Sequence, residues 1–337
     1  MKAAYIERVG PPDEIIYGEL PRPEPAGHQV LIRTGAVALN PVDTYIRGGL
    51  VPMELPLPFI VGCDVAGTVE AVGAQVTRFR PGDRVWGSNQ GLLGRQGTFA
   101  EYVVADECWL YPTPEGVSDE AAAAVALVGI TAHLGLVQRA RVRPGETVFV
   151  NGGSGGVGST VIQMARALGA RVIATAGSAE KVAACEALGA EPALNYREQD
   201  VAEALHQLAP AGVNVWWETT REPNLELAVN ALAARGRLIL MAGRDACPPF
   251  PVGPFYVKGA SAHGFVMFME HPERQRAAAK DINRWLTDGR LKPRIDRVLP
   301  LSQTAQAHRL QEDATIRGSG RLAGKIVLKP DSTSSAD

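Results

Sequence analysis

Residues 151–158 read NGGSGGVG, and this stretch decides the fold. It stands between ETVFV (146–150), an apolar run rich in β-branched residues, and STVIQMARALGA (159–170), a run with helical spacing. The glycines at positions 153, 155 and 158 satisfy the pattern G-x-G-x-x-G between a strand and a helix. Such glycines permit a tight turn and let the backbone approach a pyrophosphate at the start of the helix. The stretch therefore predicts a dinucleotide-binding loop.

Strand-like and helix-like segments continue to alternate beyond this loop, which predicts right-handed βαβ units and a parallel sheet. The expected strands are ETVFV (146–150), RVIATA (171–176), PALNY (192–196), NVWWETT (214–220) and RLILMAG (237–243). The expected helices are STVIQMARALG (159–169), SAEKVAACEALG (178–189), VAEALHQLA (201–209) and NLELAVNALAARG (224–236). Gly169, Gly189 and Gly236 stand where a helix would end in a left-handed cap.

The sequence before and after this region has a different pattern of apolar runs and breaks. Residues 1–121 contain apolar runs between Gly/Pro breaks, such as HQVLIRTGAVAL (28–39), and predict an irregular antiparallel barrel. An alanine-rich stretch, DEAAAAVALVGITAHLGL (119–136), predicts a helix at the transition. Beyond the alternating region we expect a helix over 272–289 and a final strand over 324–328 that returns to the first domain.

Composition excludes several classes of protein. The 34 Lys and Arg nearly balance the 36 Asp and Glu, so nothing favours nucleic acid or an anionic membrane as the main partner. The four cysteines, Cys63, Cys108, Cys185 and Cys247, are widely spaced and suit a reducing compartment. The stretch MKAAYIERVG has no long apolar segment, and no part of the chain approaches 18 unbroken apolar residues. These features predict a cytoplasmic protein.

The second strand of the dinucleotide-binding region indicates which cofactor binds. An NAD site usually places Asp or Glu at the end of this strand, but here the strand 171–175 is followed by Ala176. Gly177, Ser178 and Lys181 come next, so no carboxylate repels a 2′-phosphate and NADP(H) is favoured over NAD(H). In the alternative interpretation, Ser178 only caps the next helix and Lys181 is a solvated surface residue.

Eight stretches together resemble the zinc-independent, zeta-crystallin-like quinone oxidoreductases of the medium-chain dehydrogenase/reductase superfamily. They are ALNPVDTYIRGG (38–49), GCDVAGTVEAVG (62–73), RPGDRVWG (80–87), NGGSGGVG (151–158), TAGSAEK (175–181), LNYRE (194–198), GRLILMAG (236–243) and LKPRI (291–295). The resemblance implies an α/β protein with a GroES-like, β-rich catalytic domain (1–121 and 267–337) and a Rossmann NADP(H)-binding domain (122–266). It also implies an active cleft between these domains and a homodimer formed through the edge of the Rossmann sheet.

The zinc ligands of other superfamily members are replaced in this chain. Asn40 stands where those relatives have a first Cys, and Gly62-Cys63-Asp64 stands where they have Gly-His-Glu. A lone Cys63 cannot supply the three protein ligands of a catalytic zinc, and it is expected to be a small buried side chain. The six histidines form no HxH or HxxxH pair. The sequence therefore predicts a site without metal.

Metal-free chemistry favours acceptors that are already electron-poor, because no Lewis acid is present to polarise a simple alcohol or ketone. The resemblance implies that Asn40 lies near the substrate, that Tyr45 lies beside the nicotinamide, and that Thr131 lies near the nicotinamide ribose or ring. Each residue also has a structural alternative: Asn40 and Thr131 could bond their own backbone, and Tyr45 could pack between domains.

Further cofactor contacts are carried over from the family by position. Tyr196 is expected near the 2′-phosphate, Asn224 near the adenine and ribose, and Arg321 is expected to reach the cofactor from the C-terminal segment. The remaining expected contacts are Gly153, Ser154, Gly155, Gly156, Val157, Gly158, Gly177, Ser178, Lys181, Ala242, Gly243, Phe265, Val266 and Met267. The segment ETTREPN (218–224) departs from the D-x-x-G-G turn of many relatives, and the preceding Trp216 and Trp217 are expected to fill the sheet core.

The predicted function is NADPH-dependent, metal-free reduction of quinones. One alternative is an NADPH-dependent reductase of the double bond of 2-alkenals or enones, which uses the same fold and cofactor. An alternative of another class is a non-catalytic structural or RNA-binding protein of the zeta-crystallin type. The intact glycine loop and the balanced charge disfavour this last interpretation.

Overall fold

The computed structural model describes residues 1–318 and 322–331. The chain divides into two compact units. Unit 1 is formed by Met1–Leu127, Gln275–Thr287 and Lys292–Asp337, and unit 2 by Val128–Arg274 and Asp288–Leu291.

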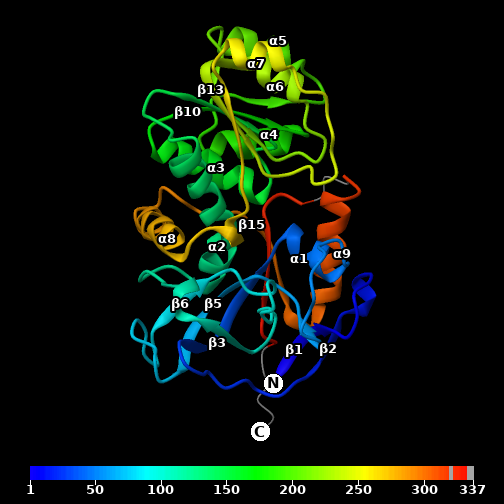
Figure 1. The fold of residues 1–337 in the computed structure, drawn as a ribbon, viewed down its shortest axis with the longest axis vertical. Coiled ribbons are helices and arrows are strands. Elements are labelled where there is room, and N and C mark those ends of the chain that lie inside the picture. Colours follow the sequence, from blue (N-terminus) through cyan, green and yellow to red (C-terminus); the bar gives the residue numbers. More distant parts are fainter. Residues whose placement is uncertain (319–321, 332–337) are drawn as a thin grey trace. The chain divides into compact units, whose positions relative to one another are not determined.

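Unit 2 contains the six-stranded parallel sheet that the sequence predicts (Figure 1). Its strands run in the spatial order β11-β10-β9-β12-β13-β14, so the first strand of the unit lies in the middle and the order reverses beside it. This is the doubly wound Rossmann arrangement. The strands are β9 (Thr147–Asn151), β10 (Arg171–Ala176), β11 (Ala193–Asn195), β12 (Val213–Glu218), β13 (Leu232–Leu240) and β14 (Ser261–Gly264).

The helices of unit 2 begin and end close to where the sequence indicates, with one exception. They are α3 (Gly156–Ala167), α4 (Ala179–Ala187), α5 (Val201–Leu208), α6 (Leu225–Ala231) and α7 (Val252–Val257). Gly169 and Gly189 adopt positive φ after α3 and α4, as left-handed caps do. The cap expected at Gly236 is wrong, because α6 ends at Ala231 and Gly236 lies inside β13. Arg235 takes the positive φ there instead.

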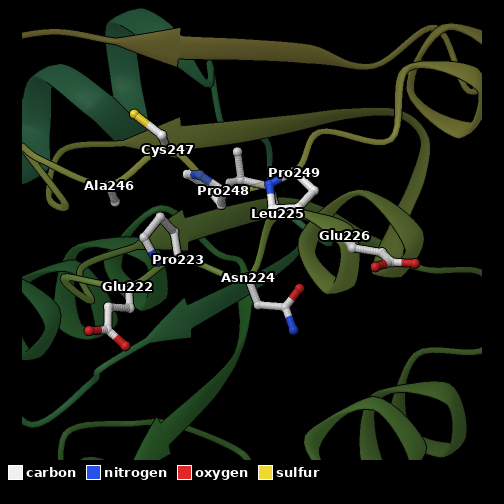
Figure 2. Close-up of a pocket in the computed structure, with 9 residues that line it drawn as sticks. All are labelled: Glu222, Pro223, Asn224, Leu225, Glu226, Ala246, Cys247, Pro248 and Pro249. Atoms are coloured by element: carbon white, nitrogen blue, oxygen red, sulfur yellow. The ribbon is translucent and has the colours of Figure 1, made fainter.

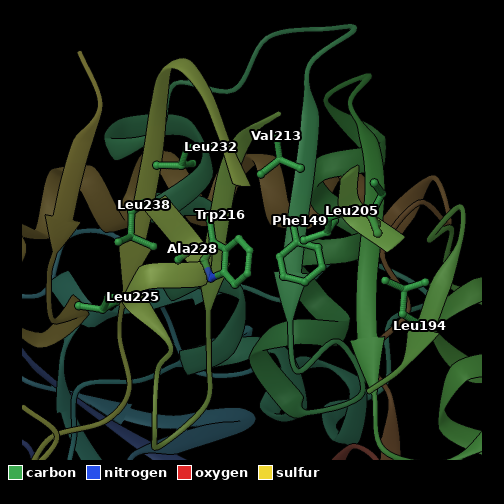
Figure 3. Packing of buried hydrophobic residues seen from close by; sticks show 10 residues of the cluster. Phe149, Leu194, Leu205, Val213, Trp216, Leu225, Ala228, Leu232 and Leu238 are labelled. Atoms are coloured by element: carbon green, nitrogen blue, oxygen red, sulfur yellow. The ribbon is translucent and has the colours of Figure 1, made fainter. Parts of the chain in front are cut away.

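Trp216 and Phe149 pack among aliphatic side chains in a core cluster of unit 2 (Figure 3). Trp217 is buried as well, as expected for both tryptophans. Trp216 on β12 lies against Phe149 on β9, with ring centroids 4.3 Å apart. Trp217 points to the opposite face and packs so closely on Gly135 that a side chain at Gly135 would collide with its ring. The packing therefore fixes both faces of β12, the strand that ends at Glu218.

A long apolar helix precedes the Rossmann sheet. α2 (Asp119–His133) continues through a π-helical segment, Leu134–Arg139. In the part of the chain that the structure describes, this helix alone is long and apolar enough to cross a membrane, with mean hydropathy 1.7. The sequence predicts this helix over 119–136, and the structure continues it to Arg139. Because 78% of the apolar window is buried inside the protein, it has the burial of a core helix.

Unit 1 is built on two sheets. The larger has seven strands in the order β15-β16-β3-β5-β6-β8, with β7 also paired to β3, and the smaller has the order β2-β1-β4. The strands are β1 (Lys2–Ile6), β2 (Ile16–Glu19), β3 (Gln29–Leu39), β4 (Phe59–Ile60), β5 (Asp64–Val72), β6 (Arg84–Gly87), β7 (Tyr102–Asp106), β8 (Leu110–Pro112), β15 (Ile295–Pro300) and β16 (Lys325–Lys329). β16 pairs with β3, so a strand from the C-terminal region completes a sheet begun near the N-terminus.

Besides the first part of α2, unit 1 contains α1 (Pro41–Arg47), α9 (Thr304–Thr315) and most of α8 (Pro272–Thr287). α1 starts directly after β3, and Asn40 and Asp43 form a capping box at its N-terminus. Its other end is held by an ion pair between Arg47 and Glu312 on α9, the helix beside it (Figure 1). α1 is therefore a short helix fixed at both ends.

Candidate active site

The glycine loop leaves β9 at Gly152, whose φ of 87° requires glycine. The three motif glycines then differ in what surrounds them. A Cβ at Gly153 would lie 2.9 Å from the Cβ of Ala174, and one at Gly158 would collide with the backbone of Gly152. A Cβ at Gly155 would meet nothing nearer than 3.8 Å. The first and third glycines thus allow close packing, whereas the second leaves open space in front of the backbone.

The start of α3 has the properties of an anion site. Gly155 is its N-cap and provides no side-chain hydrogen bond, so the N–H groups of the first turn have no side-chain cap. Ser154, Gly156 and Val157 lie in the same turn. With the helix dipole behind them, these N–H groups favour a phosphate.

The residues expected to discriminate NADP(H) from NAD(H) lie at the end of β10 and directly after it. β10 ends at Ala176, with no carboxylate there. Ser178 caps α4 by accepting a hydrogen bond from the Lys181 N–H at 3.4 Å. The half-exposed Tyr196 lies directly against Gly177, because a Cβ at Gly177 would be 2.5 Å from the Tyr196 hydroxyl oxygen. The structure thus brings Gly177 and Tyr196 together.

A surface pocket of about 470 Å³ lies beside the segments that follow β12 and β13 (Figure 2). It is lined by Glu222, Pro223, Asn224, Leu225, Glu226, Ala246, Cys247, Pro248 and Pro249. The side chain of Asn224 caps α6 by accepting a hydrogen bond from the Leu227 N–H at 2.9 Å. The two glutamates lie apart at the ends of the row of residues in Figure 2. Their negative charge disfavours a phosphate in this pocket.

The remaining predicted cofactor residues lie in loops of unit 2 or outside the described residues. Ala242 and Gly243 follow β13, and Gly243 has positive φ. Phe265, Val266 and Met267 follow β14; Val266 is 55% exposed and Met267 is buried. Arg321 lies outside the described residues.

A cluster of buried polar side chains lies in unit 1 around the start of α1. The Nδ2 of Asn40 donates to the Oδ2 of Asp64 at 2.8 Å, and its Oδ1 accepts a hydrogen bond from the ammonium of Lys325. Asp43 accepts the Asn40 backbone N–H at 2.7 Å. Cys63 is buried beside Asp43. Both functional ends of the Asn40 amide are therefore used within the protein.

Burial dominates the electrostatics of this cluster. It raises the pKa of Asp43 to about 7 and raises the pKa of Asp64 above its ordinary value. It also raises the pKa of the Cys63 thiol and lowers the pKa of Lys325, although the neighbouring carboxylates act in the opposite direction on the lysine. Each charge is thus costly alone and depends on its partners.

These residues do not fit a catalytic zinc. The ammonium of Lys325 bonds Asn40 and lies 3.7 Å from Asp64, so a positive charge already occupies the position facing the would-be ligands. Within residues 1–318 and 322–331, no group of three or more His, Cys, Asp or Glu is arranged to hold a metal ion.

Tyr45 and Thr131 differ from Asn40 in their surroundings. Tyr45 lies on α1 and is partly exposed, and its hydroxyl has no hydrogen-bond partner among the described residues. Thr131 lies near the C-terminal end of α2 and is almost fully buried. Of the two hydroxyl-bearing residues, Tyr45 is thus the more exposed to solvent.

Sequence reasoning missed the buried charges that organise both units. Lys325, Asp64 and Glu218 are buried, and each stands at one end of a strand that contains a buried apolar run. A charge at the end of such an apolar run is the signal that could have indicated them, because buried charges are rare and need partners. The identity of those partners depends on the fold.

A Rossmann sheet, a glycine loop at its central strand and a β-rich second unit together define an oxidoreductase of the medium-chain dehydrogenase/reductase type. Residues 26–115 match the family model of the alcohol dehydrogenase GroES-like domain, and residues 156–284 match that of zinc-binding dehydrogenases. The chain is 35% identical over 332 residues to a quinone oxidoreductase of Sus scrofa and 32% identical over 337 residues to one of Pseudomonas aeruginosa. Each match covers 97% of this chain and at least 97% of the relative. The chain therefore belongs to the quinone oxidoreductase family.

Solved structures agree on the fold and differ in cofactor. A structure described as an NAD-dependent alcohol dehydrogenase has a TM-score of 0.88 at 34% identity, covering 98% of this chain and 99% of that one. An Escherichia coli quinone oxidoreductase complexed with NADPH has a TM-score of 0.83 at 25% identity, covering 98% and 100%. The shared fold therefore does not distinguish NAD from NADP, and the residues of the present chain must do so.

Proposed function

We propose that this chain is an NADPH-dependent quinone oxidoreductase that works without a metal ion. The observation that carries the proposal is the bonding of Lys325 to Asn40, near Asp64, because an ammonium takes the position facing the residues that replace zinc ligands. Without a Lewis acid the site favours an acceptor that is already electron-poor. Quinones meet this condition, and the full-length relatives named as quinone oxidoreductases support this choice.

The residues after β10 support NADPH as the cofactor. Ala176 leaves no carboxylate to repel a 2′-phosphate, and Tyr196 lies against Gly177 at the same strand end. Ser178 caps α4 and Lys181 lies in its first turn, where the helix N-terminus also favours a negative charge; Glu180 in the same turn is the one acid that acts against it. The loop from Gly153 to Gly158 would hold the pyrophosphate.

In this proposal the protein itself contributes few groups to the chemistry. Bound NADPH would supply the hydride. Tyr45, whose hydroxyl is unpartnered within the described residues, would donate a hydrogen bond to the acceptor oxygen as negative charge develops there. Thr131 would orient the nicotinamide side of the cofactor. Asn40 would act by holding α1, the helix that carries Tyr45.

A second candidate is reduction of an enone or 2-alkenal. Here the β-carbon would receive the hydride and the α-carbon a proton, from Tyr45 or from water. The unpartnered Tyr45 hydroxyl is the observation that favours it. Both reactions need the same loop and the same cofactor, so only the acceptor distinguishes them.

The experiment measures oxidation of NADPH and of NADH with an ortho-quinone and with an enone, each before and after treatment with a chelator. Turnover of NADPH with the quinone that survives chelation is expected. Turnover with the enone alone would move the protein to the double-bond reductases. Exclusive use of NADH would contradict the role given to Ala176, and loss of activity on chelation would contradict metal independence.

The proposed enzyme is a cytoplasmic homodimer formed through the edge of the Rossmann sheet. β14 is the last strand of the sheet order and pairs with β13, so its other side can accept a further strand. Just before it, α7 exposes Val252, Tyr256 and Val257, the last two by 70% and 75%. Exposed apolar side chains next to an open sheet edge support association there.

A further inference from the structure

The segment ETTREPN (218–224) begins with a buried carboxylate that the proposed chemistry does not use. Glu218 is the last residue of β12, and its side chain is fully buried. The Nδ2 of Asn151 donates to its two oxygens at 3.1 and 3.0 Å. Trp216 Nε1 donates at 3.0 Å, and the N–H and hydroxyl of Thr220 donate at 2.8 and 2.6 Å. Every one of these contacts uses Glu218 as an acceptor.

The bonding continues from Asn151 to the glycine loop. Because Nδ2 of Asn151 faces the carboxylate, its Oδ1 faces the other way and accepts the Thr175 hydroxyl at 2.8 Å. A hydroxyl that donates its proton keeps a lone pair for accepting. Thr175 Oγ1 uses this lone pair to accept the N–H of Gly152 at 3.0 Å. One direction of donation therefore runs from the loop backbone to Glu218.

This series of hydrogen bonds from the Gly152 N–H through Thr175 and Asn151 to Glu218, called the relay below, crosses the centre of the sheet. Thr175 lies on β10, Asn151 ends β9 and Glu218 ends β12, three adjacent strands of which β9 is the middle one. These strand ends lie where the order of the sheet reverses, which is where open α/β sheets bind their ligands. The relay therefore lies directly below the glycine loop.

Gly152 is held from the other side as well. The hydroxyl of Thr219 donates to the carbonyl oxygen of Asn151 at 2.6 Å, and a side chain at Gly152 would collide with it. The next N–H, that of Gly153, donates to the carbonyl oxygen of Thr175 at 2.8 Å. The first turn of the loop is thus fixed by Thr175 and Thr219 before any ligand arrives.

We propose that Glu218 is a positioning residue for the dinucleotide site: through Asn151 and Thr175 it fixes the first turn of the glycine loop for the pyrophosphate. The inference rests on the proposed function, because it assumes that this loop binds the cofactor. A carboxylate suits the task since it only accepts, and so allows one orientation of Asn151 and of the Thr175 hydroxyl.

The test uses two isosteric substitutions and a matched control in the full chain. Glu218→Gln brings an amide donor among groups that all donate, and Thr175→Val removes the hydroxyl next to Gly152. Trp216→Phe removes another donor to Glu218 that has no link to the loop. Thermal unfolding of all three reports the general loss of stability, which Trp216→Phe shares.

The first readout is hydrogen–deuterium exchange of the peptide that contains Gly152, which needs no cofactor. We expect faster exchange in Glu218→Gln and Thr175→Val and an unchanged rate in Trp216→Phe. The second readout is the Kd for NADPH by titration. It should rise on the order of tenfold in each of the first two variants and rise no further in the double variant, because both break the same relay.

The two possible failures can be told apart. Unchanged exchange at Gly152 in Glu218→Gln would overturn the relay, whatever the cofactor is. A double variant whose Kd for NADPH rises by the product of the single effects would also overturn it. Wild-type protein that binds neither NADPH nor NADH would instead overturn the proposed function.

Discussion

Lys325 donates a hydrogen bond to the side chain of Asn40 across 285 residues of sequence, and both side chains are buried. The bond joins β16 to the residue that caps α1, so a strand from the C-terminal region helps to hold the helix that carries Tyr45. Asp64 lies 3.7 Å from the ammonium and completes the group. A buried cation thus organises the place where zinc-dependent relatives have their metal ligands.

Lys325→Met should be strongly destabilising. It leaves the Asp64 carboxyl buried without its cation, and breaking a buried pair on one side costs about 3–5 kcal/mol of unfolding free energy. Urea unfolding measures the change. The control Lys329→Met removes an ion pair with Glu120 that is partly exposed, and should cost about 1 kcal/mol or less. Equal losses in the two variants would contradict the argument, whereas Lys325→Met combined with Asp64→Asn should regain part of the stability.

The buried Asp43 should make stability fall as pH rises. Burial raises its pKa in the folded protein to about 7, above its ordinary value, so the folded state binds the proton more tightly than the unfolded state. Its contribution is complete below pH ~4 and is lost by pH ~7, with a slope of up to about 1.4 kcal/mol per pH unit. Asn40, Cys63, Asp64 and Lys325 face the same carboxyl; Asp64 adds to the rise of the Asp43 pKa, and the other three oppose it.

The measurement for Asp43 is the free energy of unfolding of the wild type and of Asp43→Asn across this pH range. Subtracting the two curves removes the contributions of other titrating groups. The free energy of unfolding of Asp43→Asn, relative to that of the wild type, should increase as pH rises. A difference that stays constant between pH ~4 and ~7 would show that the Asp43 proton is not held as burial requires.

The fold could be predicted from the sequence because it depends on patterns that are local. The alternation of apolar strands and helices around residues 151–158 predicts the parallel sheet, and the structure confirms it. The helix cap at Gly236 failed because the left-handed position fell on Arg235 one residue earlier, within a strand that began sooner than the apolar pattern indicates. Propensity places such boundaries less well than it places elements.

The site could be predicted less completely, because its partners are distant in sequence. The glycine loop is a contiguous motif, but Glu218 lies 67 residues from Asn151, and Lys325 lies 285 residues from Asn40. No local pattern pairs these residues. What the sequence does contain is a charged residue at one end of each of the apolar runs of β5, β12 and β16, which indicates a buried polar contact without naming the partner.

Gly155→Ala should separate binding from folding. The added methyl would meet nothing in the protein nearer than 3.8 Å, so stability should fall by about 1 kcal/mol or less. If the pyrophosphate lies against this backbone, the methyl would occupy its place, and the Kd for NADPH should rise by on the order of tenfold or more. The control Gly158→Ala would collide with backbone and should lose both stability and binding. Unimpaired binding by Gly155→Ala would show that the cofactor does not approach here.

Val257→Asp should disrupt the proposed dimer. Val257 is 75% exposed on α7, close in sequence to the edge strand β14, and an interface there would bury it. Placing a carboxylate in an apolar interface costs several kcal/mol unless it is paired, which exceeds what most surface changes cost. Light scattering after gel filtration should therefore show a dimer for the wild type and a monomer for the variant. Val9→Asp, at an exposed valine of unit 1, should leave the dimer intact. A monomeric wild type would contradict the proposed dimer, and a dimer that tolerates Val257→Asp and breaks with Val9→Asp would place the association elsewhere.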